Sequence, residues 1–116
     1  MSNYWINKAN RRLRRYGNVK CLAEDIRKLD IPEHSFDVIS IFHVIHDIAP
    51  EERQGITARL AELLNKNGKL FIREPIKKSH GMPVEEILFL LTSSGLEEIQ
   101  SDVCKSEYKG IFKYEA

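Results

Sequence analysis

The sequence lacks the features that mark several large classes of protein. It has only two cysteines, Cys21 and Cys104, which are too few and too far apart for a disulfide framework. No apolar run approaches the roughly 18 residues of a transmembrane helix, and the first residues do not have the apolar block of a signal peptide. With 18 basic and 17 acidic residues, the chain is not a globally basic nucleic-acid binder. These absences favour a cytoplasmic protein in a reducing compartment, with no membrane partner.

The composition that remains suits one folded domain. Hydrophobic residues make up 42% of the 116 residues and charged residues 30%, which is enough for a packed core under a polar surface. We expect a single domain over residues 1–116.

Charge is unevenly distributed along the chain. Residues 1–20 contain six basic side chains and no acidic one, which leaves 12 basic and 17 acidic residues in the remainder, a net charge of −5. A basic first helix could bind RNA or DNA, and the chain would then be a non-catalytic interaction module. The alternative is a solvated helix face that pairs with acidic residues elsewhere. We favour this alternative because the arginines are not interleaved with aromatic residues for base stacking.

Hydrophobic periodicity predicts alternating helices and strands. The predicted helices cover residues 3–16, with Gly17 as a stop, a segment from Pro50 to the pair Asn67-Gly68, and a segment from Pro83 to Gly95. The predicted strands are residues 19–23, 36–45, 69–73, 97–104 and 108–114, the last two forming a hairpin. Residues 26–35 are expected to hold at most one helical turn, and residues 74–82 to form an exposed loop.

The predicted strand at residues 36–45 is nearly continuously apolar, which is typical of a parallel strand covered on both faces. The order of the elements predicts an α/β fold whose sheet is mostly parallel and ends in an antiparallel hairpin.

Four segments together resemble a known family. They are Asn-Val-Lys-Cys-Leu-Ala-Glu-Asp at 18–25, Ser-Phe-Asp-Val-Ile-Ser at 35–40, Phe-His-Val-Ile-His-Asp-Ile at 42–48 and Lys-Leu-Phe-Ile-Arg-Glu-Pro at 69–75. Their order and spacing are similar to the later part of the class I S-adenosylmethionine-dependent methyltransferases. The resemblance covers almost the whole chain. It implies a truncated Rossmann-like sheet, S-adenosylmethionine as cofactor, and methyl transfer to an acceptor that the sequence does not identify.

The resemblance assigns roles to individual residues. Asp25 and Ile26 match the positions that contact the adenine ring, and residues 43–46 match the segment between cofactor and methyl acceptor. His43 and Val44 are therefore candidate cofactor contacts, and His43 and His46 are candidate proton acceptors. Asp25 could instead cap a turn, and either histidine could simply bond to the backbone. His43, His46 and Asp47 could together bind zinc, but the two histidines share a face only in a helical segment and the sequence defines no further ligand, so no metal is assigned.

One family feature is missing, the glycine-rich turn after the first strand. The glycines stand singly, at positions 17, 55, 68, 81, 95 and 110. Without that turn the backbone cannot approach the methionine part of the cofactor closely, so we expect poor cofactor binding by this chain alone. In the family, the first two strands also separate the third from the fourth. Their absence predicts an apolar strand edge that recruits a second copy or a complementing chain.

Overall fold

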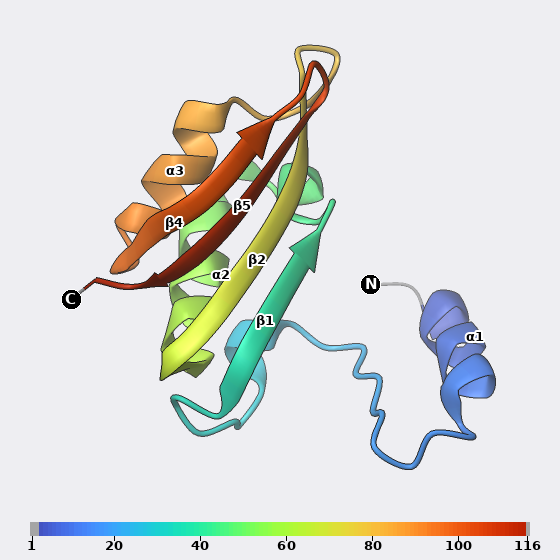
Figure 1. Cartoon of the computed structure of the whole chain (residues 1–116). Helices are drawn as coiled ribbons and strands as arrows, with labels where there is room; N and C mark the ends of the chain where they lie inside the picture. Colours follow the sequence, from blue (N-terminus) through green and yellow to red (C-terminus); the bar gives the residue numbers. More distant parts are fainter. Residues whose placement is uncertain (1–2, 116) are drawn as a thin grey trace.

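The structure, a computed structural model, describes residues 3–115. Its elements are α1 (Asn3–Leu13), η1 (Ile26–Lys28), β1 (Phe36–Phe42), η2 (Ile45–Asp47), α2 (Pro50–Leu63), β2 (Leu64–Lys77), β3 (His80–Gly81), α3 (Val84–Thr92), β4 (Leu96–Val103) and β5 (Glu107–Tyr114). The sheet has the strand order β1-β2-β5-β4, and β3 pairs with the end of β2. Figure 1 shows α2 and α3 on one face of this sheet and α1 apart from it.

The pairing directions explain how the chain is connected. β1 pairs parallel with β2, and α2 is the crossover between them. β5 lies antiparallel between β2 and β4, so the C-terminal hairpin folds back into the sheet. The predicted α/β class and the antiparallel hairpin are confirmed. Among the described strands only the β1–β2 pair is parallel, so the sheet is not mostly parallel as expected, because β5 of the hairpin pairs antiparallel with β2.

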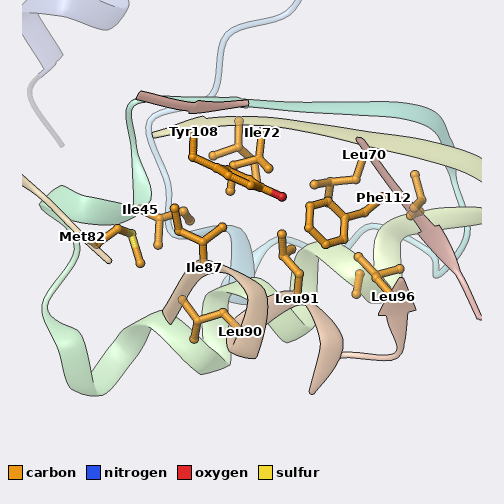
Figure 2. Packing of buried hydrophobic residues seen from close by; sticks show 13 residues of the cluster. Ile45, Leu70, Ile72, Met82, Ile87, Leu90, Leu91, Leu96, Tyr108 and Phe112 are labelled. Carbon is orange, nitrogen blue, oxygen red and sulfur yellow. The ribbon is translucent and has the colours of Figure 1, made fainter. Parts of the chain in front are cut away.

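The hydrophobic core lies between the sheet and the two helices that cover it. Alternate residues of neighbouring strands point into the core, and α3 contributes residues at helical spacing. Its members include Leu70, Ile72, Tyr108, Phe112, Ile87, Leu90 and Leu91, which pack together in Figure 2.

The helices of the structure lie where the sequence predicts them, but two of them are shorter than predicted. The turn within residues 26–35 and the helix before Gly95 are confirmed. The first helix ends at Leu13, one turn before the predicted stop at Gly17. α2 ends at Leu63 and β2 begins at the next residue, so the pair Asn67-Gly68 lies within β2 rather than at a helix end. In the described part of the chain, no helix is both long and apolar enough to cross a membrane.

The strand predicted at residues 19–23 does not form. These residues have no regular secondary structure, and Val19 and Leu22 are 43% and 41% exposed. An extended segment becomes a strand only when a neighbour accepts and donates its backbone hydrogen bonds. Figure 1 shows this segment running apart from β1.

The prediction that residues 36–45 are covered on both faces is wrong. β1 ends at Phe42 and stands at the edge of the sheet, paired with β2 alone. Ile41 on the helix-covered side is buried, whereas Val38 and Phe42 are 60% and 54% exposed. The apolar run is therefore a strand with one bare face and one free edge.

The exposed loop predicted at residues 74–82 is wrong at both ends: His80 and Gly81 form β3, and Met82 is buried in the core because the chain turns back onto β2. β2 continues to Lys77, and Glu74 is fully buried. Glu74 is in phase with Leu70 and Ile72 on the core side of the strand. The alternation of residues 70, 72 and 74 indicates a strand, although a charged residue at the third position does not suggest burial.

An arginine from α2 fixes the segment that follows β1. Buried Arg53 donates from Nε to the carbonyl of Ile48 at 2.9 Å and from Nη2 to the carbonyl of His46 at 3.0 Å. Its Nη1 pairs with Glu86 of α3 at 2.8 Å. One planar guanidinium thus ties η2 to both helices.

The free edge of β1 generates a first prediction, that the chain associates with a second copy or a complementing chain. Unpaired backbone groups beside exposed apolar side chains recruit another strand. Light scattering coupled to size exclusion over a wide dilution range should detect species larger than a monomer. Val38→Lys should shift them toward monomer, whereas Val103→Lys, at a similarly exposed site on β4, should not. A compact, cooperatively unfolding monomer at every concentration would contradict the prediction.

A second prediction concerns Arg53→Met, which removes all three bonds of the guanidinium but keeps an unbranched side chain. We expect a loss of about 2–3 kcal/mol in the free energy of unfolding, because two partly buried backbone carbonyls and Glu86 lose a charged donor. Urea denaturation measures the loss. The control is Arg27→Met, which breaks more exposed pairs with Asp25 and with Glu52 of α2 and should cost much less. Equal losses in the two variants would argue against this role of Arg53.

Candidate functional site

The carboxyl end of β1 carries most of the candidate residues, beginning with His43. Its φ of +53° lies in the left-handed region, and its backbone N–H donates to the carbonyl of Arg73 at 2.8 Å. For a residue other than glycine this conformation costs free energy. It is kept where surrounding contacts impose it, often at functional sites. The left-handed turn ends β1 and starts the segment from residue 44 to 48.

Glu74 on β2 fixes the residues that follow His43. Its Oε2 accepts the backbone N–H groups of Val44 and Ile45 at 3.0 and 3.1 Å. Its Oε1 accepts the backbone N–H of His46 at 3.2 Å and lies 2.8 Å from Nδ1 of the same residue. The buried carboxylate therefore satisfies the N–H groups that begin η2.

The imidazole of His46 is enclosed as well as anchored. Its side chain is 5% exposed, and its ring packs edge-on against that of His80, with 4.7 Å between the ring centroids. The ring of His46 thus bonds to the carboxylate of Glu74, and not to the backbone as in the alternative that the sequence left open.

His43 is held by a second carboxylate and stays accessible. Its Nε2 lies 2.7 Å from Oε2 of Glu107, and its side chain is 39% exposed. Arg73 binds the same carboxylate through Nη2 at 2.8 Å and Nε at 3.2 Å. Hydrogen bonds from Arg73, and secondly from His43, lower the pKa of Glu107 to about 2. The guanidinium of Arg73 also lies over the ring of Phe42, 4.6 Å from its centroid.

Sequence reasoning did not find Arg73 and Glu107. They are 34 positions apart and meet because β2 and β5 pair in a register that places Glu107 opposite Pro75, two residues beyond Arg73. Nothing local in the sequence encodes that register.

Three of the four residues expected at the cofactor, Asp25, Ile26 and Val44, lie around one hollow of about 440 Å³. The remainder of the lining is mostly aliphatic and includes Ile39, Ile41, Ile45, Ile48, Ile56 and Leu60. An apolar surface with a carboxylate at its edge is a common form of site for a planar organic ligand. His43 and His46 lie outside this lining.

Asp25 also has a structural role, as the sequence left open. Its side chain accepts the backbone N–H of Arg27 at 2.9 Å and so caps η1. The guanidinium of Arg27 binds both carboxylate oxygens, the shorter contact being 2.7 Å. These hydrogen bonds lower the pKa of Asp25 to about 2. A ligand that bonds to Asp25 must share it with Arg27 or displace Arg27.

His43 and His46 lie close together, with 6.2 Å between the ring centroids. Each is engaged by its own carboxylate. Among the described residues, no group of three or more His, Cys, Asp or Glu side chains is placed to hold a metal ion.

Comparison with solved structures shows where this fold occurs. N-methyltransferase NodS from Bradyrhizobium japonicum, solved with S-adenosylhomocysteine, superposes with a TM-score of 0.84 at 18% identity, covering 99% of this chain and 64% of NodS. The PH0226 protein of Pyrococcus horikoshii gives 0.81 at 16% identity, covering 98% and 68%. A 1,6-didemethyltoxoflavin N1-methyltransferase from Burkholderia thailandensis gives 0.80 at 17% identity, covering 94% and 57%. The chain thus spans between 57% and 68% of the length of these proteins, and the expected truncated Rossmann-like fold is confirmed.

Comparison at the level of sequence identifies the family. A search of curated proteins gives no significant match. A family model for a methyltransferase domain matches residues 1–72, which is more than half of the chain. This match confirms the resemblance found in the segments around Asp25 and His43. The chain belongs to the methyltransferase domain family.

Proposed function

We propose that the chain is a single, partial methyltransferase domain that acts with S-adenosylmethionine on a hydroxyl or amine acceptor. The observation that carries the proposal is the hollow that brings Val44 together with the neighbouring pair Asp25 and Ile26, since the family resemblance assigns all three to the cofactor. The S-adenosylhomocysteine bound to NodS and to the Burkholderia enzyme supports the same cofactor.

The residues present fit the adenine half of that cofactor. Ile26, Val44 and Ile39 offer an apolar surface for the ring faces, and Asp25 offers a carboxylate for the exocyclic amine. The carboxylate is ionised near neutral pH because Arg27 lowers its pKa to about 2, so it can only accept.

The methionine half of the cofactor lacks a comparable set of residues. No Gly-x-Gly sequence exists in the chain, and the free edge of β1 lies beside the hollow where Ile39 and Ile41 line it. A partner strand on this edge would complete that half of the site. Cofactor affinity and association through the β1 edge are therefore expected to rise together.

His43 is the residue best placed to receive a proton from the acceptor. It stands at the carboxyl end of β1, where α/β folds bind ligands, and its imidazole is accessible while that of His46 is enclosed. S-adenosylmethionine supplies an electrophilic methyl group, and the protein has to align the acceptor with it and take up the proton that is released.

The proposal includes a cytoplasmic location. Both cysteines are free, and Cys104 is exposed. An exposed thiol stays reduced more readily in a reducing compartment than in an oxidising one.

Calorimetric titration tests the cofactor proposal. We expect S-adenosylhomocysteine to bind more weakly than about 10 μM, or roughly −7 kcal/mol, and adenosine to bind about as well, because the adenine half carries the contacts. Val44→Asp should abolish both by placing a charge in the hollow. Val19→Asp, which puts the same charge at an exposed site outside the lining, should abolish neither. Binding of S-adenosylhomocysteine well below 10 μM would refute the view that half of the site is missing, and no binding of either compound would refute the proposed cofactor site.

A second function is favoured by one observation on α1 and the residues after it. The cation of Lys8 lies over the ring of Trp5, and that of Arg15 over the ring of Tyr16, at 5.4 and 4.9 Å from the ring centroids. Trp5 also stacks on Tyr4, and both are more than half exposed. Two basic side chains therefore lie against accessible aromatic rings, and positive charge beside aromatic rings is a combination that binds single-stranded nucleic acid.

The test of this second function is binding of a fluorescent single-stranded RNA at several salt concentrations. If α1 binds nucleic acid, affinity should fall steeply with salt, and replacing Arg11, Arg12, Arg14 and Arg15 with Gln should weaken it at every salt concentration. Lys77→Gln and Lys78→Gln, exposed in the β2–β3 turn, serve as the control. Absence of binding at low salt would eliminate the function.

A further inference from the structure

We infer that Glu107 is a positioning residue, which holds the proton of neutral His43 on Nε2 and leaves Nδ1 free to accept one. The inference deepens the proposed methyl transfer and rests on it for the final role of His43. The position of the proton itself follows from geometry alone and can be measured without cofactor or acceptor.

The argument starts from the carboxylate. Arg73 donates to both oxygens of Glu107, at 2.8 and 3.2 Å, and Lys109 lies 4.0 Å from Oε1. Surrounded by these cations, Glu107 stays ionised in the neutral range, and an ionised carboxylate is an acceptor only. The imidazole nitrogen that lies 2.7 Å from it must therefore be the one that carries hydrogen.

The consequence for His43 is a defined tautomer. A neutral imidazole carries one hydrogen, so a hydrogen on Nε2 leaves a lone pair on Nδ1. The backbone of His43 is fixed as well, by its N–H bond to Arg73. Arg73 therefore orients His43 twice, through the main chain and through Glu107.

His46, three residues later, bonds to a carboxylate through the other ring nitrogen. Its Nδ1 lies 2.8 Å from Oε1 of Glu74, so Nδ1 carries hydrogen there. Asp47, with a largely exposed side chain, lies 3.3 Å from Nε2. With a carboxylate near each ring nitrogen and the ring of His80 packed against it, the imidazole of His46 is less accessible to a ligand than that of His43.

Methyl transfer to a hydroxyl or amine releases one proton from the acceptor. The lone pair of the acceptor's oxygen or nitrogen forms the new bond to the methyl carbon, and the old bond to sulfur breaks with its electron pair left on sulfur. The hydrogen of the acceptor passes to Nδ1 of His43. The imidazolium that forms keeps its Nε2–H on Glu107, whose negative charge stabilises it.

The experiment is a two-bond ¹H–¹⁵N spectrum of the whole labelled chain at about pH 8.5, two units above the reference pKa of ~6.5 for histidine. His43→Gln and His46→Gln assign the two rings. We expect His43 as a single Nε2–H tautomer and His46 with hydrogen on Nδ1. Glu107→Ala should convert His43 to a mixture of tautomers and leave His46 unchanged. The control, Glu97→Ala, removes a carboxylate of the exposed β4–β5 pair with Lys113 and should change neither ring.

Three results would overturn the inference: a hydrogen on Nδ1 of neutral His43, a doubly protonated His43 at this pH, or an unchanged His43 signal in Glu107→Ala. The spectrum of the unaltered chain, once its two rings are assigned, decides the first two, so these do not depend on the folding of Glu107→Ala. A chain with the expected tautomer but no affinity for S-adenosylhomocysteine or adenosine would refute the proposed cofactor site and leave the role of Glu107 standing.

Discussion

The candidate site depends on Glu74, a carboxylate without solvent contact. The hydration that such a group loses has to be replaced by hydrogen-bond donors of the protein. Burial of an unpartnered carboxylate would be prohibitive. Glu74 is tolerated because the backbone N–H groups of residues 44 to 46 and the imidazole of His46 all point at it. The same bonds force the chain to turn sharply after β1, which leaves His43 at the exposed start of the turn.

A second constraint acts from the other side of this turn. Arg53 donates to the carbonyls of His46 and Ile48, while Glu74 accepts the N–H groups of residues 44–46. Buried charged side chains therefore satisfy both the donors and the acceptors of this backbone segment. Such paired anchoring makes a short segment rigid without regular structure of any length. The two anchors, Arg53 on α2 and Glu74 on β2, also position the end of β1 without any contact from the first two strands of the family fold.

The sequence allowed the prediction of elements whose signals are local and failed where the signal lies in long-range pairing. The α/β class, α3 and the hairpin of β4 and β5 follow from periodicity and turn residues. The strand at residues 19–23 had the right composition but no neighbour to pair with. Glu74 adjoins a polar, proline-containing segment that favours a loop, whereas its phase with Leu70 and Ile72 indicates the core side of a strand. Asp25, Ile26 and Val44 could be placed on one hollow through the family pattern, whereas Arg73 and Glu107 depend on the β2–β5 register.

The two halves of the site therefore differ in how they are stabilised. The end that would handle the acceptor is held by ion pairs and hydrogen bonds within the chain, through Glu74, Arg53 and the Arg73–Glu107 pair. The end that would hold the cofactor is an apolar hollow beside an unpaired strand edge, with nothing described in the chain to cover that edge. Apolar surface of this kind is stabilised when a partner removes it from water. Completion of the cofactor site by an added strand would then require no rearrangement around His43, since the contacts that position it are already made on the opposite side of β1.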